Sequence, residues 1–282
     1  MSRKPRIVAA VAALSIALAA CGGGSSSSSS ASSGSDTGDG AATEIETADP
    51  TFQPISAGKL TVCSDVPYPP FEFQDDAGKW TGFDIDVISA VAQRYGLTVE
   101  VSKQPFDTIL VAVGAGTCDL VASAVTITEE RAKNVLFSDP YFDADQSLLV
   151  RTEDAETYVD LASLAGKTIA VQTGTTGETY AKENAGDAKV QSFDDPAAMF
   201  LALESKQVDA VLQDLPVNVD RANKQDAKTK VTATFPTGEQ YGFAIAKDNT
   251  ALQNDVNEAL NIFRSSGTYD EIYAKYFGAA NG

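Results

Sequence analysis

The stretch GFDIDVISAVAQRYG (residues 82–96) indicates how the folded part of this chain is built. Its apolar residues recur at helical spacing, and Gly96 is typical of the end of a helix. Short apolar runs typical of strands lie on both sides of it, KLTVCS (residues 59–64) and LTVEVSK (residues 97–103). Alternation of this kind predicts an α/β fold with parallel strands.

The same order of elements returns later in the chain. KTIAVQ (residues 167–172) is predicted to be a strand that leads through the turn TGTTGE into a helix, and VDAVLQ (residues 208–213) is predicted to be a strand after a second helix. The repetition predicts two lobes of similar build. Two extended segments, residues 145–154 and 239–248, bracket the second unit and would form a two-strand hinge.

The predicted fold is therefore α/β and two-lobed, with a mainly parallel sheet flanked by helices in each lobe. Lobe 1 is expected to comprise residues 59–143 and 242–282, because the chain would leave it at the first hinge segment and return at the second. Lobe 2 is expected to comprise residues 144–241.

The N-terminal residues are predicted to direct export. A basic start is followed by the apolar run IVAAVAALSIALAA, which is too short to span a bilayer, so residues 1–20 are predicted to be a signal peptide. Cys21 follows this run directly and resembles the lipidated cysteine of bacterial lipoproteins. The resemblance implies acyl chains, palmitate among them, that hold the protein at the outer face of the cell membrane. Residues 21–58, rich in Gly and Ser, would be a flexible tether.

The charge and composition exclude several kinds of function. The formal net charge of −18 becomes −21 without residues 1–20, and such a charge argues against binding of nucleic acid or adsorption to anionic lipid. The chain has no His, which excludes Ser-His-Asp catalysis and His-ligated metal sites. No metal or cofactor is expected.

Two cysteines remain in the part of the chain that is predicted to fold. Cys63 lies near the end of one predicted strand, and Cys118 begins another. In parallel neighbouring strands of matching register they would lie roughly 13 Å apart, beyond the reach of a disulfide. Two buried free thiols are therefore expected.

Polar residues follow the predicted strands, where ligands bind in open parallel sheets. Arg131 offers donors suited to a carboxylate, and Thr175 and Thr176 open a helix whose N-terminus also favours an anion. Asp214 suits an ammonium group, and Tyr68 offers an apolar wall. Together they would bind an α-amino acid. The alternatives are a solvated arginine, a plain turn, a helix N-cap at Asp214 and core packing of the aromatic residues.

The sequence resembles the family 3 extracellular solute-binding proteins, which capture polar amino acids for ABC importers. The resemblance extends from about Lys59 to Gly278, and Tyr95 is bulkier than the residue usual in the family. It implies a type II periplasmic-binding-protein fold that closes on its ligand. The matching motifs are GFDIDVISAVAQRYG, YPPFEF, TITEERAKNVLFSDPYF, GTTGETY, DAVLQD and GTYDEIYAKYFG.

The resemblance also implies roles for the residues around the ligand's backbone atoms. Arg131 would clamp the α-carboxylate, assisted by the hydroxyl and backbone of Thr126 and by the N–H of Thr176. Asp214 would bind the α-ammonium group. Ala124 stands where Gly or Ser is common in the family, so it would contribute through its backbone.

Further residues would select the ligand's side chain. Tyr68 and Phe106 would sandwich it, and Asp65, Gln172 and Gln213 would line the far end of the pocket. An Asp with two Gln favours a cationic or hydrogen-bonding side chain. The expected order of ligands is arginine or lysine, then glutamine, then histidine.

The partners implied by the resemblance are a free amino acid and an ABC permease with its cytoplasmic ATPase. The protein would be a monomer that touches the membrane through its lipid anchor alone. It would not be an enzyme. Two alternatives stay open at this point: a lipid-anchored amino-acid sensor, and an enzyme resembling arogenate or prephenate dehydratases on the same fold.

Overall fold

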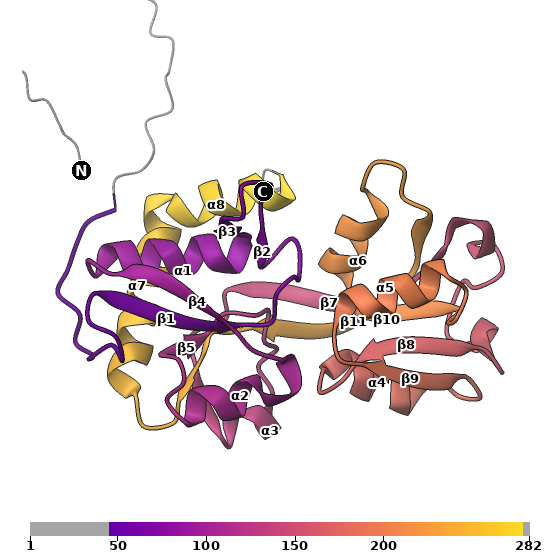
Figure 1. Ribbon diagram of the computed structural model, residues 1–282, viewed down its shortest axis with the longest axis horizontal. Helices are drawn as coiled ribbons and strands as arrows, with labels where there is room; N and C mark the ends of the chain where they lie inside the picture. Colours follow the sequence, from indigo (N-terminus) through magenta and orange to yellow (C-terminus); the bar gives the residue numbers. More distant parts are fainter. Residues whose placement is uncertain (1–44, 279–282) are drawn as a thin grey trace, which may run out of the picture. The chain divides into compact units, whose positions relative to one another are not determined.

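The structure is a computed structural model that describes residues 45–278. The predicted signal peptide, the predicted lipidation site Cys21 and the tether up to residue 44 lie outside the described residues. The described part contains two five-stranded sheets, one in each lobe (Figure 1). Within it, no helix combines the length and apolar character needed to cross a membrane.

Lobe 1 is built on a sheet of strand order β4-β1-β5-β12-β6. The first three strands are parallel, and β12 runs antiparallel to both of its neighbours. A separate hairpin, β2–β3, lies in the segment between β1 and α1. The elements of lobe 1 are β1 (Lys59–Ser64), β2 (Phe73–Gln74), β3 (Trp80–Thr81), α1 (Phe83–Arg94), β4 (Thr98–Lys103), α2 (Phe106–Gly114), β5 (Leu120–Val121), α3 (Glu129–Ala132), β6 (Val135–Phe137), β12 (Ala244–Ala246), α7 (Thr250–Ser266) and α8 (Thr268–Phe277).

Lobe 2 repeats this arrangement with a sheet of order β11-β7-β10-β8-β9. Here β9, β8 and β10 are parallel, and β7 runs antiparallel to β10 and β11. The elements are β7 (Phe142–Arg151), the 3₁₀ helices η1 (Thr152–Asp154) and η2 (Ala162–Leu164), β8 (Thr168–Gln172), α4 (Thr176–Asn184), β9 (Lys189–Phe193), α5 (Pro196–Glu204), β10 (Ala210–Asp214), α6 (Leu215–Ala222) and β11 (Thr229–Tyr241).

The predicted α/β two-lobed fold is confirmed, including the repeated build. In lobe 1, β1 lies between β4 and β5, and in lobe 2, β8 lies between β9 and β10. In each sheet a single strand, β12 or β7, runs antiparallel to the other four. Each sheet is therefore mixed, although most of its strands share one direction.

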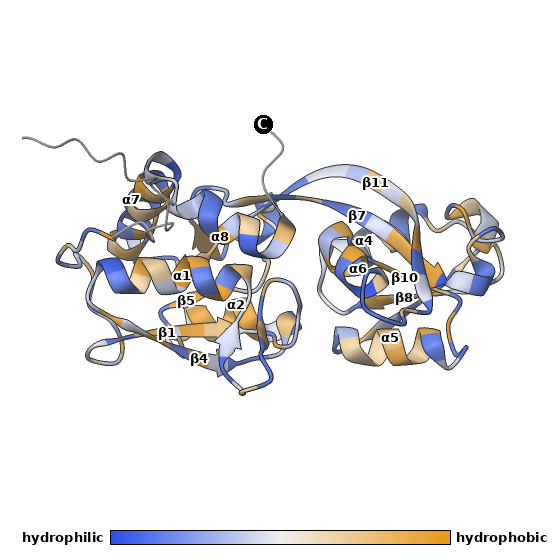
Figure 2. Ribbon diagram, turned by 90° about the horizontal axis from the view of Figure 1, so that it is seen from above, coloured by the Kyte–Doolittle hydropathy of each residue, from blue (hydrophilic) through white to orange (hydrophobic). Residues whose placement is uncertain are grey.

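Two long strands, β7 and β11, connect the lobes (Figure 2). Phe142 at the start of β7 and Tyr241 at the end of β11 are buried in the core of lobe 1. Leu148 and Val150 of β7 are buried in the core of lobe 2. The two strands pair antiparallel, with register shifts on either side of Ala233–Phe235, and form the two-strand hinge.

Successive side chains of a strand point to opposite faces of the sheet, and helices cover both faces. In β1, Leu60 and Val62 pack in the same core as α1 and α7, whereas Cys63 packs on the other face with Ile109 of α2. Lobe 2 follows the same rule, because Leu148 faces the α4 side and its neighbour Leu149 the α5 side. This two-sided burial explains why the strands read as continuous apolar runs.

The helix predicted from residues 82–96 is present as α1, which ends at Arg94. Gly82 precedes it with φ of 119°, and a Cβ atom there would lie 2.1 Å from the carbonyl oxygen of Phe71. Only glycine allows this close approach, which brings residues 70–72 against the start of α1.

The last part of the predicted tether differs from the expectation. Phe52 is buried in the core of lobe 1. Thr51 donates hydrogen bonds from its N–H and its hydroxyl to the Asp255 carboxylate, at 2.6 and 2.8 Å. Residues 45–58 therefore pack along lobe 1, because one aromatic side chain and a few backbone donors in this segment find partners there.

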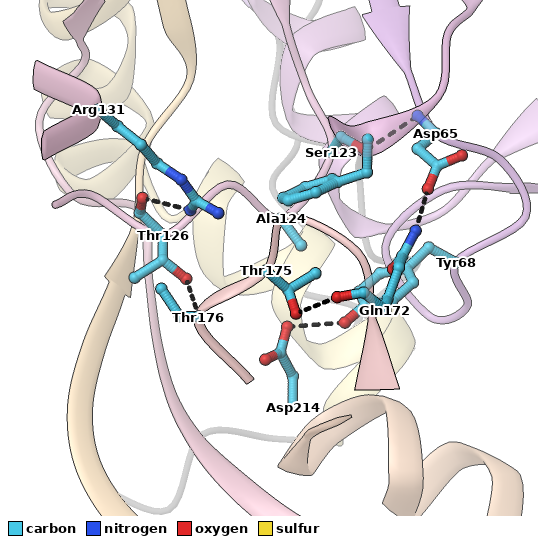
Figure 3. A pocket seen from close by; sticks show the side chains of 11 residues that line it. Asp65, Tyr68, Ser123, Ala124, Thr126, Arg131, Gln172, Thr175, Thr176 and Asp214 are labelled. Carbon is cyan, nitrogen blue, oxygen red and sulfur yellow. Dashed lines mark hydrogen bonds between the residues drawn. The ribbon is translucent and has the colours of Figure 1, made fainter. Parts of the chain in front are cut away.

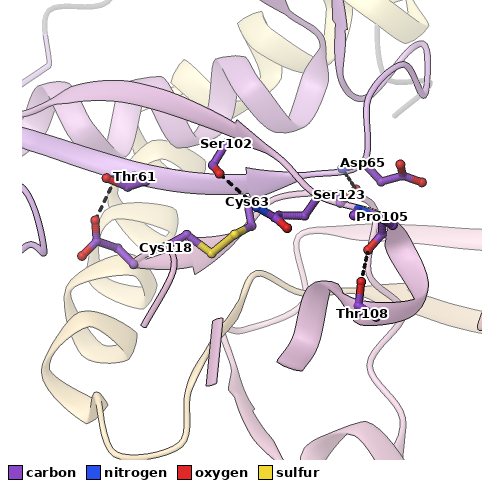
Figure 4. The surroundings of a disulfide bond; sticks show 10 residues. Thr61, Cys63, Asp65, Ser102, Pro105, Thr108, Cys118 and Ser123 are labelled. Atoms are coloured by element: carbon purple, nitrogen blue, oxygen red, sulfur yellow. Dashed lines mark hydrogen bonds between the residues drawn. A yellow bond between two sulfur atoms is a disulfide. The ribbon is translucent and has the colours of Figure 1, made fainter. Parts of the chain in front are cut away.

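The prediction of two free thiols is wrong, because Cys63 and Cys118 form a disulfide with their Cα atoms 5.7 Å apart (Figure 4). The prediction assumed that both residues extend along paired strands. However, β5 begins only at Leu120, and Cys118 lies before it, in the connection from α2. There the N–H of Asp119 bonds the carbonyl of Thr61, which brings Cys118 beside β1.

Removing this disulfide is expected to lower the free energy of unfolding by about 2–4 kcal/mol, because the bond closes a loop of 55 residues in the unfolded chain. The variant Cys63→Ala/Cys118→Ala, compared with the wild type by urea unfolding, measures the effect. Equal midpoints for the two proteins under oxidising conditions would contradict the expectation.

Candidate ligand-binding site

A cavity lies between the lobes, at the carboxyl ends of their parallel strands (Figure 3). Lobe 1 contributes mainly loop residues after β1 and β5, and lobe 2 contributes the ends of β8 and β10 and the start of α4. The lining residues are Asp65, Tyr68, Phe106, Ser123, Ala124, Thr126, Arg131, Gln172, Thr175, Thr176 and Asp214.

Of the predicted ligand-contacting residues, Gln213 alone does not line this cavity. Its side chain is buried in β10, and neither of its polar atoms has a hydrogen-bond partner among the described residues. Gln172 and Gln213 lie on neighbouring parallel strands, but only Gln172 reaches the cavity. The sequence position next to Asp214 therefore did not decide whether the side chain lines the cavity.

Arg131 is held on lobe 1 by the short helix α3, whose N-cap Thr128 accepts a hydrogen bond from the Arg131 N–H at 3.1 Å. Its guanidinium donates to the carbonyl oxygens of Thr126 at 2.8 Å and of Gly174, on lobe 2, at 3.0 Å. The same group lies 5.3 Å from the centre of the Phe106 ring. Burial lowers the pKa of Arg131, and two of its five N–H donors are bonded to these carbonyls. It is a positioned cation, not a solvated surface charge.

Asp214 begins α6, but its side chain makes no capping hydrogen bond. Its carboxylate instead accepts from the hydroxyls of Tyr68 at 2.7 Å and Tyr241 at 2.6 Å and from the amide of Gln146 at 2.6 Å. Burial and the nearby charge of Glu239 raise its pKa, while these three donors act to lower it. The alternative of a simple helix cap is therefore not supported.

A second carboxylate, Asp65, lies at another part of the cavity wall. It accepts a hydrogen bond of 2.6 Å from the side-chain amide of Gln172 across the interlobe space. Its N–H donates to the hydroxyl of Ser123 at 2.9 Å. Burial raises the pKa of Asp65 to about 6, and the Gln172 hydrogen bond opposes this shift. Asp65 and Gln172 thus form one polar part of the cavity wall, in which the carboxylate accepts a hydrogen bond and the amide donates it.

The loop Ser123–Ala124 rests on two buried acids. Ala124 has a positive φ of 46°, an uncommon conformation for a residue with a Cβ atom, and its N–H donates to the Asp84 carboxylate at 2.8 Å. Ser123 donates its hydroxyl to Glu72 at 2.8 Å. Both acids come from motifs of the sequence analysis, YPPFEF and GFDIDV, and both are fully buried. These motifs therefore shape the loop that lines the cavity.

The hydroxyls of Thr126 and Thr176 bind a partner that the sequence did not predict. Both donate to the same carboxylate oxygen of Glu239, at 2.9 and 2.7 Å. A hydroxyl has one hydrogen to donate. In this arrangement the Thr126 hydroxyl therefore cannot also donate to a ligand carboxylate, and only its backbone and the N–H of Thr176 stay available.

Comparisons with known proteins agree with this geometry. A family model described as bacterial extracellular solute-binding proteins, family 3, matches residues 60–279. The chain belongs to this family. The predicted family is thereby confirmed.

Relatives of this solute-binding protein carry the names of several amino acids. A probable histidine-binding protein of Neisseria gonorrhoeae is 34% identical over 78% of this chain and 84% of its own length. The glutamine-binding protein GlnH of an ABC transporter of Bacillus subtilis (strain 168) is 34% identical over 71% of this chain and 74% of its own. An ancestral arginine-binding protein, solved with arginine bound, has a TM-score of 0.75 and 40% identity over 78% of this chain and 99% of its own.

These relatives are all named as amino-acid-binding proteins, in agreement with the family description. Within residues 45–278, no group of acidic or cysteine side chains is arranged to hold a metal ion.

Several residues of the site escaped the sequence analysis. Ser123 lines the cavity next to the predicted Ala124, whereas Thr175, which was expected at the anion-favouring helix start, lines it as well. Gln146, Glu239 and Tyr241 bind the lining residues from the hinge strands. Ser123 could have been found from its place beside a strand-end motif. The hinge residues carry no local signal, because long strands bring them to the site from elsewhere.

Proposed function

We propose that this protein captures a cationic L-amino acid, arginine or lysine in first place, between its two lobes. The observation that carries the proposal is that Arg131 and Asp214 border one cavity from opposite lobes. A guanidinium suits an α-carboxylate, and a buried carboxylate suits an α-ammonium group. Only a ligand with both charges would bridge the two.

The charge of the cavity supports a cationic side chain. Asp65 and Asp214 line it and Glu239 bonds its threonines, whereas Arg131 is the one cation among the lining residues. An amino acid with a neutral side chain would balance Arg131 and Asp214 but would bring no positive charge to Asp65, whose interacting charge of opposite sign, Lys103, lies outside the lining of the cavity. Arginine or lysine would supply that charge, so the proposed order stays arginine or lysine, then glutamine, then histidine.

Closure of the lobes would follow from the positions of these groups. Lobe 1 and lobe 2 already share the hydrogen bonds Tyr68–Asp214 and Gln172–Asp65. A ligand that adds contacts to both lobes has higher affinity for the closed form and shifts the population toward it. An ABC permease with its ATPase would receive the amino acid from that form.

The proposed cellular setting rests on the N-terminal sequence. Cys21 would carry the lipid, and the protein would act as a monomer on the outer face of the cell membrane. Mass spectrometry of the protein extracted from membranes tests this directly, since diacylated Cys21 gives the mature chain a defined mass increase.

Isothermal titration of the purified protein with each of the twenty amino acids tests the proposed ligand class. Arginine or lysine should bind most tightly, and glutamine should follow. Tightest binding of an acidic or an aliphatic amino acid would refute the class. Loss of arginine uptake on deletion of the gene would distinguish a transport component from a sensor.

Asp65→Asn is expected to weaken arginine binding roughly 30- to 1,000-fold while changing glutamine binding less than tenfold. The substitution removes the carboxylate that would face the guanidinium of bound arginine, whereas glutamine has no such charge. Titration calorimetry with both ligands measures the contrast. The matched control is Asp107→Asn, an exposed carboxylate nearby that does not line the cavity. An equal loss for both ligands would contradict the role of Asp65.

The same carboxylate predicts a pH dependence. Burial raises its pKa to about 6, so protons compete with a cationic ligand as the pH falls below that value. Arginine affinity should therefore decline about tenfold per pH unit below pH 6. In Asp65→Asn this decline should disappear.

A further inference from the structure

We propose that Glu239 is a latch on the hinge, which stabilises the closed arrangement of the lobes before any ligand binds. Glu239 lies on β11, opposite Ala144 of β7, directly after a register shift between these hinge strands. Its carboxylate reaches a threonine of each lobe. Glu239 does not line the cavity itself and would act as a positioning residue.

The contacts of the latch join three parts of the molecule. Thr126 follows β5 in lobe 1, and Thr176 is the first residue of α4 in lobe 2. Both hydroxyls donate to Oε2 of Glu239, at 2.9 and 2.7 Å. The two hydroxyl oxygens are 3.4 Å apart, so they meet at this carboxylate. Because the donors belong to different lobes, both bonds exist only when the lobes are together.

Gln146 connects Glu239 to Asp214, the proposed partner of the α-ammonium group. Its amide nitrogen donates to Asp214 at 2.6 Å and lies 3.2 and 3.3 Å from the two carboxylate oxygens of Glu239. Gly177 leaves room for this amide, since a Cβ atom there would lie 2.8 Å from its oxygen. The two acids are thus held by one buried donor on the hinge strand β7.

The charge of Glu239 also acts on the groups around it. It raises the pKa of Asp214 and opposes the effect of burial on Arg131. The carboxylate therefore acts on both the cation and the anion of the site, and its negative charge favours the charged guanidinium without a ligand.

The hydrogen-bond donors around the site would therefore have different partners. While Glu239 holds the two threonine hydroxyls, a ligand carboxylate would rely on Arg131 and on backbone N–H groups. The latch would favour ligand binding indirectly, because the apparent dissociation constant rises as the population of the binding-competent form falls.

Small-angle X-ray scattering of the ligand-free protein tests the latch. Glu239→Ala should give a larger radius of gyration than the wild type, because the lobes separate more often. Glu239→Gln, which keeps one acceptor oxygen, should lie between the two. Asp143→Asn is the matched control, since this exposed hinge carboxylate accepts its hydrogen bond from Gln240 on the other hinge strand and bonds neither threonine. An unchanged radius in Glu239→Ala would overturn the proposal.

A double-mutant comparison with arginine as the probe adds a second readout. Glu239→Ala should weaken arginine binding about tenfold, as expected for hydrogen bonds to a charged group. Glu239→Ala/Thr176→Val should bind no more weakly than Glu239→Ala alone, because the two side chains act through one contact. Additive losses, or tighter binding in Glu239→Ala, would overturn the latch. The scattering result does not depend on which amino acid binds, so a wrong ligand class and a wrong latch remain distinguishable.

Discussion

Arg131→Ala is expected to reduce arginine binding at least 1,000-fold, to the limit of detection by titration calorimetry. The guanidinium is half-buried, lies against Phe106 and reaches Gly174 of lobe 2. Its loss would leave the ligand carboxylate without a charged partner in a site whose other nearby charges are negative. Truncating one member of a buried charge pair costs about 2–5 kcal/mol or more, largely because the other charge is left unpaired.

Two further variants make this test specific. Arg131→Lys should recover part of the affinity, because an ammonium group keeps the charge but not the planar fork of donors. Lys133→Ala is the matched control, since Lys133 is an exposed cation beside the same short helix and pairs with Glu130. Circular dichroism should give all three variants the wild-type spectrum. Near-native affinity in Arg131→Ala would refute the clamp.

The second large effect is a pH dependence of stability that originates beneath the cavity. Asp84 is fully buried and accepts from the N–H of Ala124 and the hydroxyl of Tyr141. Burial raises its pKa to about 7, although both donors act to lower it. Burial and the charge of Asp84 raise the pKa of Glu72 well above its usual range. The second carboxyl oxygen of each acid has no hydrogen-bond partner within residues 45–278.

The sign of the effect follows from proton binding. A carboxyl whose pKa is higher in the folded state keeps a proton that the unfolded chain releases. Its contribution to stability is greatest below about pH 4 and is lost as the pH rises through about 7. The free energy of unfolding attributable to Asp84 should therefore fall by up to roughly 4 kcal/mol across this range.

Urea unfolding at pH 5 and at pH 8 measures this effect. The wild type should be less stable at pH 8, and Asp84→Asn should show a much smaller difference, because the amide stays neutral and can donate as a protonated acid does. Glu72→Gln should act in the same direction. A wild-type protein that gains stability between pH 5 and pH 8, with Asp84→Asn unchanged in this respect, would contradict the prediction.

Much of the fold was encoded in short-range patterns. The 3.6-residue spacing in residues 82–96 predicted α1, and apolar runs predicted the strands, because these patterns reflect burial that is decided locally. The cavity residues Arg131 and Asp214 were also predictable. The chemistry of a residue at a strand end follows from its type, and parallel strands bring such ends to a common edge.

Other features depended on contacts that no local pattern specifies. The disulfide formed because Cys118 lies in a turn before β5 rather than in the strand. Gln213 missed the cavity although its neighbour Asp214 lines it, since alternate side chains of β10 face opposite sides.

The sequence by itself determined the two-lobed architecture and the charged groups at the strand ends, because periodicity and residue type are properties of single segments, and its motifs resemble those of one family. Only the tertiary structure decided that Glu239 joins a threonine from each lobe, and that Glu72 and Asp84 support the loop beneath the cavity. The partners in these contacts are separated by up to 113 residues along the chain. Their meeting depends on strand register and on how the hinge sets the lobes, which no single segment encodes.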